Sequence, residues 1–181
     1  MNHNAIENYI PEHVKEMLAQ LNDLEATSEA ALCGGALRDL YLGGEVSDWD
    51  IFCTVRSGDL ETISNIFYIV SSLGFTISHS HGNGYVEGSD GFIADFRLGD
   101  IDFILYGKTS YCTIDKLVLD FDLNINAWVY YPYDPVDRVV NLTDWDKTKP
   151  VKVLNQSKDV RMGARLPRFK AKYPNLLWGD L

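Results

Sequence analysis

Residues 33–52 read CGGALRDLYLGGEVSDWDIF and place a Gly-Gly pair fourteen residues ahead of two aspartates that a single tryptophan separates. The apolar run EAALC comes before the glycine pair, and ALRDLYL after it is long enough for two helical turns that stop at Gly43. The following SDWDIFCTV alternates between polar and apolar residues, as a strand does. Residues 29–55 therefore predict a strand, a glycine turn, a helix and a second strand.

Both ends of this unit carry a recognisable chemistry. A Gly-Gly turn leaves backbone N–H groups open to an anion, and the dipole of the helix that follows adds to the attraction. We therefore expect Gly34 and Gly35 to bind phosphate groups. Alternation places Asp48 and Asp50 on one face of the strand, where their oxygens suit Mg²⁺. A phosphate-binding turn beside paired carboxylates is what transfer from a nucleoside triphosphate (NTP) requires, with two Mg²⁺ ions stabilising the attacking and leaving oxygens.

Two-metal chemistry needs a third carboxylate on the side of the attacking group. Asp102 is our choice because it lies mid-strand between two large apolar residues, where a carboxylate needs a partner or a metal. Asp95 in the preceding run is the alternative. The two runs, FIADFRL and IDFILYG, are joined by residues 98–100 and predict an antiparallel hairpin.

The remaining patterns predict a small α+β domain. Apolar residues recur at helical spacing in PEHVKEMLAQLNDL and in LETISNIFYIVSSLG. LNINAWVYY favours a strand or a short helix, and YDPVDRVVN favours a turn and extended chain. The last thirty residues look helical, with interruptions expected at Pro167 and Pro174.

Composition limits the classes of protein to consider. A chain of 181 residues, 46% of them apolar and 23% charged, can bury a core without disulfides or a structural metal. Three cysteines make no disulfide framework, no apolar run is long enough to cross a membrane, and the first residues do not read as a signal peptide. We therefore expect a cytoplasmic protein with reduced thiols.

The charge is distributed unevenly along the chain. A net charge of −10 argues against a general nucleic-acid binder. Residues 151–181 nevertheless hold seven Lys or Arg against two Asp, while residues 1–150 hold nine basic residues against 24 acidic ones. The basic segment either contacts an anionic partner or is a solvated surface helix. Arg161, Arg165 and Arg168 stand at helical spacing and are the candidates for contact with RNA.

The glycine pair and the aspartates together resemble a known signature. It is that of the head domain of bacterial-type (class II) tRNA nucleotidyltransferases, the CCA-adding enzymes, and of bacterial poly(A) polymerases. It runs Gly-Gly, one residue, an aliphatic residue, Arg-Asp, Leu-Leu-Gly and Asp-x-Asp. The residues that match without a gap are Gly34, Gly35, Leu37, Arg38, Asp39, Leu42, Gly43, Asp48 and Asp50.

A second stretch, FDLNINAWVYYPYDPVDRVVN, is similar to the family segment Arg-Arg-Asp-Phe-Thr-Ile-Asn-Ala-Leu-Ala-Tyr and the Asp-Pro that follows it. The matching residues are Asp122, Ile125, Asn126, Ala127 and Tyr130. The resemblance covers about residues 8–140. It implies the nucleotidyltransferase head of the DNA polymerase β-like superfamily, with a mixed, partly antiparallel sheet flanked by helices. We accordingly expect a head domain over residues 1–150 and a basic, partly helical appendage over residues 151–181.

The resemblance also implies roles for individual residues. Asp48, Asp50 and a later carboxylate would hold the metal ions. Gly34 and Gly35 would hold the triphosphate, Asp122 and Asn126 would lie near the sugar, and Arg38 would be a further nucleotide-binding residue.

The sequence departs from the family at positions that matter. Asp120 and Phe121 stand where the family has two arginines, which weakens phosphate binding unless other cations substitute. The Glu-Asp-x-x-Arg element that reads the base in CCA-adding enzymes has no counterpart, and the long helical body that holds tRNA is missing.

We therefore expect a Mg²⁺-dependent nucleotidyltransferase that moves a nucleoside monophosphate from an NTP to an acceptor hydroxyl and releases pyrophosphate. The acceptor that the resemblance implies is an RNA 3′ end, in particular that of a tRNA. The acidic body fits transfer to a protein side chain or a small molecule instead, and a non-catalytic module that binds nucleotides or a partner is a further alternative. A homodimer or a partner chain would supply the missing RNA-binding surface.

Overall fold

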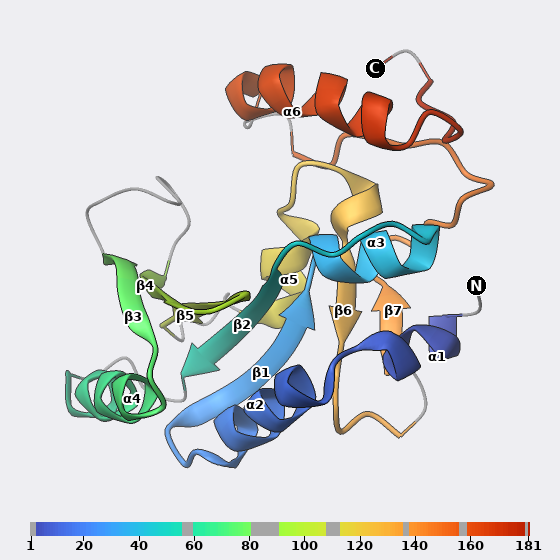
Figure 1. Cartoon of the computed structure of the whole chain (residues 1–181). Coiled ribbons are helices and arrows are strands. Elements are labelled where there is room, and N and C mark those ends of the chain that lie inside the picture. Colours follow the sequence, from blue (N-terminus) through green and yellow to red (C-terminus); the bar gives the residue numbers. More distant parts are fainter. Residues whose placement is uncertain are drawn as a thin grey trace.

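The computed structural model describes residues 3–55, 60–80, 91–107, 113–135, 138–155, 159–179 and 181. In this part of the chain one seven-stranded sheet forms the centre, in the order β3-β4-β5-β2-β1-β6-β7 (Figure 1). The strands are β1 Thr27–Cys33, β2 Trp49–Val55, β3 Thr76–Ser80, β4 Phe92–Leu98, β5 Ile101–Tyr106, β6 Trp128–Tyr130 and β7 Val139–Asn141. The helices are α1 His3–Ile6, α2 Glu12–Asp23, α3 Gly35–Leu42, α4 Leu60–Ser72, α5 Ile114–Leu119 and α6 Asp159–Lys172, with 3₁₀ turns η1 Glu7–Tyr9 and η2 Asn124–Asn126.

The sheet is mixed, as the sequence predicts. β2 pairs in parallel with β5, and each of the other neighbouring pairs is antiparallel. β4 and β5 form the expected hairpin. The parallel pair sets Asp50 of β2 directly opposite Asp102 of β5, so two predicted site residues are neighbours across the ladder.

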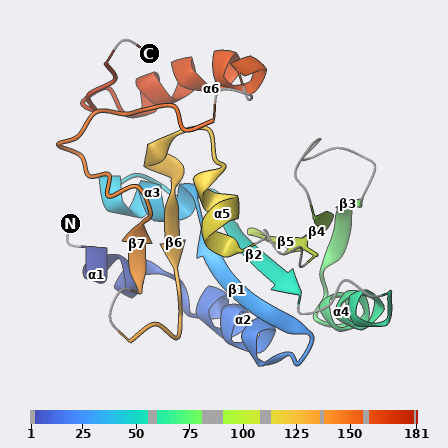
Figure 2. The same ribbon diagram turned by 180° about the vertical axis from the view of Figure 1, so that it is seen from behind.

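Each face of the sheet has its own core. α2 covers the face that is towards the reader in Figure 1, and α5 covers the opposite face, which is in front in Figure 2. Trp49 and Ile51 pack into the core on the α2 side, whereas Phe52 packs with Ile104 and Val118 on the α5 side. The alternation predicted for residues 47–55 is therefore confirmed, and Asp50 lies on the α5 face.

The glycine turn between β1 and α3 has a backbone that needs glycine. Gly34 has φ 78° and ψ −128°, a combination that side-chain-bearing residues avoid. Helix α3 then ends at Gly43, which is left-handed at φ 74° and closes the helix with bonds from its N–H to the carbonyls of Asp39 and Leu40. The predicted strand–turn–helix–strand unit is confirmed.

Two expectations differ from the structure. β3 was not predicted, because residues 76–80 carry a single large apolar side chain, Ile77, and that side chain is half exposed. The helix at the end of the chain runs through Pro167 instead of breaking there. A proline ring crowds the carbonyl of the residue four positions earlier, and this residue is Gly163, whose backbone adapts easily. The helix ends at Lys172, just before Pro174.

The segment that leads into α6 is attached to the sheet domain by backbone hydrogen bonds. Leu154 donates its N–H to the carbonyl of Asp122 at 2.9 Å, and Leu123 forms a bridge with Val153. Helix α6 itself lies across the end of the sheet at which α3 begins (Figures 1 and 2). A domain boundary at residue 150 stays a prediction.

The Gly34 turn gives a direct test of backbone strain. Gly34→Ala should lower the free energy of unfolding by about 2–4 kcal/mol, because alanine is strained at this φ and ψ and its Cβ would lie 3.3 Å from the Phe121 ring. Gly43→Ala is the matched control, since nothing lies within 4 Å of a Cβ there and only the left-handed φ opposes it. Urea denaturation compares the two, and equal losses would contradict a special constraint at Gly34.

Candidate active site

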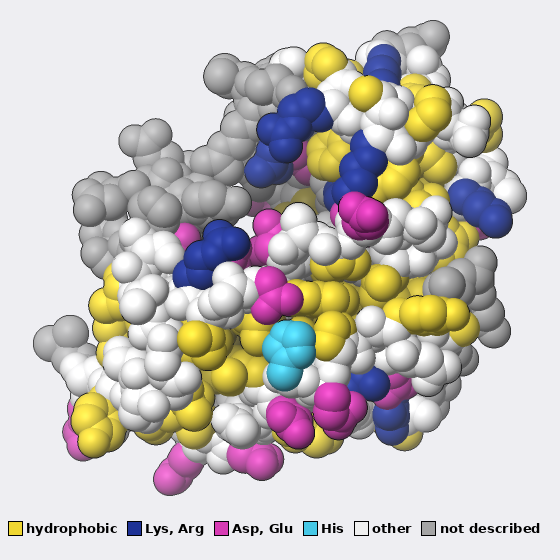
Figure 3. Space-filling view, viewed as in Figure 1, with side chains coloured by type: hydrophobic (Ala, Val, Ile, Leu, Met, Phe, Trp, Pro, Cys, Tyr) yellow, Lys and Arg dark blue, Asp and Glu magenta, His cyan; other side chains and the backbone are white. Residues whose placement is uncertain are grey.

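A cavity of about 410 Å³ opens between the sheet, the start of α3, the α5–η2 segment and α6. Figure 3 shows Lys and Arg side chains on both sides of a hollow in which acidic side chains are visible. Every residue that the sequence predicts for the site lines this cavity: Gly34, Gly35, Arg38, Asp48, Asp50, Asp102, Asp122 and Asn126. Arg165 and Arg168 of α6 line it too, whereas the side chain of Arg161 lies outside the described part.

The glycine turn lies directly against the carboxylates. A Cβ built on Gly34 would be 3.9 Å from Oδ2 of Asp50 and 3.3 Å from the ring of Phe121. One detail corrects the sequence analysis: the Gly34 N–H is not open to an anion, because it donates to the carbonyl of Trp128 at 2.9 Å. The groups that face an anion are therefore those of the first turn of α3, beginning at Gly35, where helical N–H groups lack partners within the helix.

Three aspartates come together on the α5 face of the sheet. Asp50 and Asp102 face each other across β2 and β5, and Asp48 precedes β2 by one residue and accepts a 2.9 Å hydrogen bond from Ser47. Arg97 lies beside Asp102, with its Nη1 3.5 Å from Oδ2 of that carboxylate. Asp95, the alternative third carboxylate, is 9% exposed on β4 and does not line the cavity.

The carboxylates repel one another. Burial, followed by the charges of Asp48 and Asp102, raises the pKa of Asp50 to about 7, while Arg165 and Arg38 act in the opposite direction. Burial also raises the pKa of Asp102, and the charge of Arg97 opposes this rise. The site thus holds more negative charge than its surroundings balance, which a bound cation would relieve.

The donor chemistry fits Mg²⁺, which prefers one or two carboxylates together with phosphate oxygens and water. As the side chains stand, no group of three His, Cys, Asp or Glu residues within the described ranges could hold a metal ion. Asp102 forms its ion pair with Arg97 of β4. Asp102 would have to turn away from Arg97 in order to share an ion with the other two aspartates.

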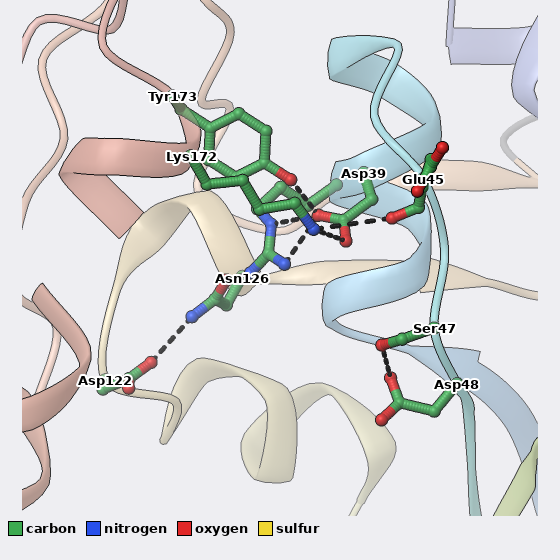
Figure 4. A network of polar contacts seen from close by, with 9 residues as sticks. Asp39, Glu45, Ser47, Asp48, Asp122, Asn126, Lys172 and Tyr173 are labelled. Atoms are coloured by element: carbon green, nitrogen blue, oxygen red, sulfur yellow. Dashed lines mark hydrogen bonds and ion pairs between the residues drawn. The ribbon is translucent and has the colours of Figure 1, made fainter. Parts of the chain in front are cut away.

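A continuous polar network forms the opposite wall of the cavity (Figure 4). Arg165 Nη1 lies 3.1 Å from Oδ2 of the buried Asp122. Asn126 donates to Oδ1 of the same aspartate at 2.8 Å and accepts a hydrogen bond from Arg38. Asp122 and Asn126 therefore connect α6 to α3, in addition to facing the cavity.

The network continues through a buried ion pair. Arg38 contacts Oδ1 of Asp39 at 2.6 Å through both Nε and Nη2, and both residues are less than 10% exposed. Lys172 reaches Oδ2 of Asp39 at 2.7 Å, and Tyr173 donates its hydroxyl to Oδ1. The guanidinium of Arg38 also lies 4.8 Å over the ring of Phe169. Arg38 is thus a structural tie between α3 and α6, and its contact with a nucleotide stays a prediction.

The sequence analysis missed the part of α6 that lines the cavity besides the arginines. Phe169 and Lys172 lie on the same helical face as Arg165 and Arg168, at spacings of three and four residues. The four side chains align on one face only if the helix is continuous. Because a break was expected at Pro167, the sequence did not predict this face. Among the described residues that line the cavity, the basic ones come from α3 and α6. Asp48, Asp50 and Asp102 come from the approach to β2, from β2 and from β5.

An aromatic wall closes the cavity beside the glycine turn. The ring of Phe121 lies edge-on to Phe52 at 5.6 Å, and Phe52 lies 5.7 Å from Tyr106. These side chains pack between the sheet and α5, and they leave the approach to Asp50 apolar on this side. An apolar ring, Phe121, therefore stands at a position where the sequence resemblance implies an arginine.

Comparisons with known proteins support the fold. No family model matches the sequence, and no curated protein matches it. Among solved structures, a CCA-adding enzyme in complex with ATP is similar to 92% of this chain and 40% of its own, with a TM-score of 0.57 and 20% identity. The Thermotoga maritima CCA-adding enzyme complexed with tRNA is similar over 93% of this chain and 39% of its own length, with a TM-score of 0.56 and 20% identity. A tRNA-processing enzyme in an apo form is similar over 88% of this chain and 41% of its own length, with a TM-score of 0.52 and 18% identity.

At this identity the likenesses show the fold alone: the chain has the mixed α+β fold found in part of these solved enzymes. The chain spans about two-fifths of the length of the structures that it matches. None of the helices in the described ranges is both long enough and apolar enough to span a membrane.

The raised pKa of Asp50 predicts a stability effect that depends on pH. The folded protein keeps the proton up to about pH 7, whereas the unfolded chain loses it near pH 4, so rising pH between these values destabilises the fold. Asp50→Asn removes this penalty. Without metal, the variant should be more stable than the wild type by about 2–4 kcal/mol at pH 8 and nearly equal to it at pH 4.

Chemical denaturation in EDTA at both pH values measures the difference. Added Mg²⁺ should stabilise the wild type at pH 8 and leave Asp50→Asn almost unchanged. A variant that gains nothing between pH 4 and pH 8 would contradict the raised pKa of Asp50 that burial and the neighbouring carboxylates produce.

The buried ion pair predicts unequal effects of its partners. Asp39→Ala leaves the buried Arg38 uncompensated and should lower the free energy of unfolding by about 3–5 kcal/mol. Lys172→Ala removes a side chain that is 43% exposed and should change stability by less than about 1 kcal/mol. Thermal and urea unfolding test both, and similar losses for the two variants would show that Arg38 does not depend on Asp39.

Proposed function

We propose that this chain is a Mg²⁺-dependent nucleotidyltransferase related to the class II tRNA nucleotidyltransferases. The observation that carries the proposal is the convergence of eight sequence-predicted residues, from four separate segments, on one 410 Å³ cavity. A glycine turn lies against a carboxylate there, at the start of a helix, and this arrangement suits a phosphate ester with bound cations. The structural similarity to solved enzymes supports the fold, and the site residues support the activity.

Asp48, Asp50 and Asp102 would hold two Mg²⁺ ions, which supply charge neutralisation at the phosphates and lower the pKa of the attacking hydroxyl. In the reaction the acceptor oxygen forms a bond to the α-phosphorus of the NTP. The bond from this phosphorus to the oxygen that bridges to the β-phosphorus breaks, and pyrophosphate leaves. The hydroxyl proton passes to Asp102 or to water.

The N–H groups at the start of α3 would bind the phosphates together with cations from α6. Arg165 and Arg168 line the cavity, whereas Asp120 and Phe121 stand where the sequence family has arginines. We therefore assign these two α6 arginines to the nucleotide in place of the RNA contact that the sequence predicts. Asp122 and Asn126 would contact the sugar from the opposite wall.

For the acceptor we propose an RNA 3′ end, in particular that of a tRNA. The similar solved structures include a CCA-adding enzyme bound to tRNA and others bound to ATP or CTP. A second chain, identical or different, would supply the RNA-binding surface, and a cytoplasmic location agrees with the free thiols of Cys33 and Cys53. Transfer to a protein or a small molecule is the second candidate, because the net charge of −10 disfavours RNA.

A label-transfer assay tests the function. The protein is incubated with Mg²⁺ and each α-labelled NTP, with total tRNA in one set and a cell protein extract in another. We expect label on RNA, and its loss by at least about 10³-fold in Asp48→Ala and Asp50→Ala, because these carboxylates carry the metal chemistry. Asp23→Ala is the control, since this exposed aspartate at the end of α2 lies outside the cavity.

Label on protein that depends on both aspartates would establish the second candidate. NTP binding without label in any set, retained in both aspartate variants, would show a nucleotide-binding module and exclude transfer. Asp102→Asn should abolish transfer and Asp95→Asn should leave it within about threefold, and the reverse result would reassign the third carboxylate.

A further inference from the structure

Arg97 occupies a distinctive position beside the three carboxylates. It lies on β4 as the direct partner of Asp102 on β5, with Nη1 3.5 Å from Oδ2 of this aspartate. Its Nε donates to the carbonyl of Gly99 at 3.3 Å, so the β-turn between the two strands steadies the guanidinium. The side chain is nevertheless 52% exposed, and it keeps donors available for a ligand.

Arg97 stands beside the cavity without lining it, and the cations that do line it lie on the other side of the carboxylates. Arg38 belongs to α3, and Arg165, Arg168 and Lys172 belong to α6, where they face the glycine turn and the polar wall. The strand order β4-β5-β2 puts Arg97 on the side of Asp102 that is away from Asp50. Within the described residues, Asp50 and Asp102 therefore lie between Arg97 on one side and the four cations of α3 and α6 on the other.

This separation matches the two ends of an in-line displacement. The phosphates of an NTP bound at the glycine turn leave towards α3 and α6, so the acceptor hydroxyl must approach from the other side of the α-phosphorus. That side is the side of Asp102. Whatever the acceptor carries within a few ångströms of its hydroxyl then meets Arg97.

The charges around Arg97 define the chemistry of this group. Asp100 in the turn and Asp102 on β5 are 51% and 25% exposed, so an anionic acceptor is repelled along this rim except where the guanidinium stands. The existing ion pair is half exposed, and such pairs contribute about 0–1 kcal/mol, so a ligand can replace it. A guanidinium is suited to bidentate binding of a phosphate.

We propose that Arg97 binds the phosphodiester that precedes the terminal 3′ hydroxyl of the acceptor RNA. The inference rests on the proposed function, because that function places the acceptor next to Asp102. When the phosphodiester binds, Arg97 exchanges Asp102 for the acceptor, and the carboxylate becomes available on the side of Asp50. Arg97 is a binding residue in this scheme, and it selects acceptors that have an anionic group next to the hydroxyl.

The test is a binding cycle between the side chain and the phosphate. The probe is a fluorescent RNA hairpin with an acceptor-stem sequence and a 3′ hydroxyl, and its counterpart carries an uncharged methylphosphonate at the last linkage. Fluorescence anisotropy with Mg²⁺ and α,β-methylene NTP present gives the dissociation constant for both probes. Arg97→Gln, Arg97→Lys and the wild type are compared, with Lys152→Gln as the control at an exposed position outside the cavity.

Arg97→Gln should weaken binding of the normal hairpin by roughly tenfold or more, and the methylphosphonate should weaken wild-type binding by a similar factor. The two changes together should weaken it no further than either alone, because they remove the same contact. Arg97→Lys should restore part of the affinity, and Lys152→Gln should match the wild type. The affinity for the NTP analogue alone should stay within about twofold in each variant.

If Arg97→Gln and the methylphosphonate each weaken binding and their factors multiply when combined, the contact between Arg97 and this phosphate is overturned. Equal binding of both probes by the wild type would overturn it as well, and so would a wild type that binds neither hairpin. The label-transfer assay separates these results from failure of the proposed function, because transfer to another acceptor would persist there. A wild type that binds no NTP analogue would overturn both proposals.

Discussion

The buried pair of Arg38 and Asp39 is the interaction on which the completed site depends. Removing two charges from water is unfavourable unless each is matched, and here Asn126, Lys172 and Tyr173 supply the remaining partners. The partners come from η2, α6 and the residue after it, so the pair is satisfied only when α6 lies in place. The pair therefore specifies where the last helix docks, and the same helix brings Arg165 and Arg168 to the cavity.

The acidic side of the cavity works against stability, and the basic side works with it. Burial first, and then the like charges of Asp48 and Asp102, raise the pKa of Asp50, so its ionised form costs the fold stability. On the opposite wall each buried charge has a partner of the other sign. The excess negative charge is thus concentrated at Asp48, Asp50 and Asp102. Such a concentration indicates a binding site for a cationic ligand, because charges with a purely structural role tend to be paired.

Local chemistry made the centre of the fold predictable from sequence, and distance in sequence limited the rest. Gly34, Gly43 and the alternation around Asp50 act through their own backbone or strand, so their pattern predicts their structure. The hydrogen bonds from Arg38 to Asn126 and from Arg165 to Asp122 join residues 88 and 43 positions apart, and no local pattern encodes them. β3 lacks an apolar face of its own, and the helical path through Pro167 depends on a glycine four residues earlier.

The position of Phe121 shows how a site can change its electrostatics without changing its fold. The ring packs against Phe52 and fills space beside Gly34, so this wall of the cavity is stabilised by apolar contact and offers nothing to a phosphate. Positive charge enters instead from α6, a helix that is held by polar contacts near its middle and at its end. The capacity of the cavity to bind an anion is therefore coupled to the docking of α6, and through Asp39 to the integrity of one buried pair.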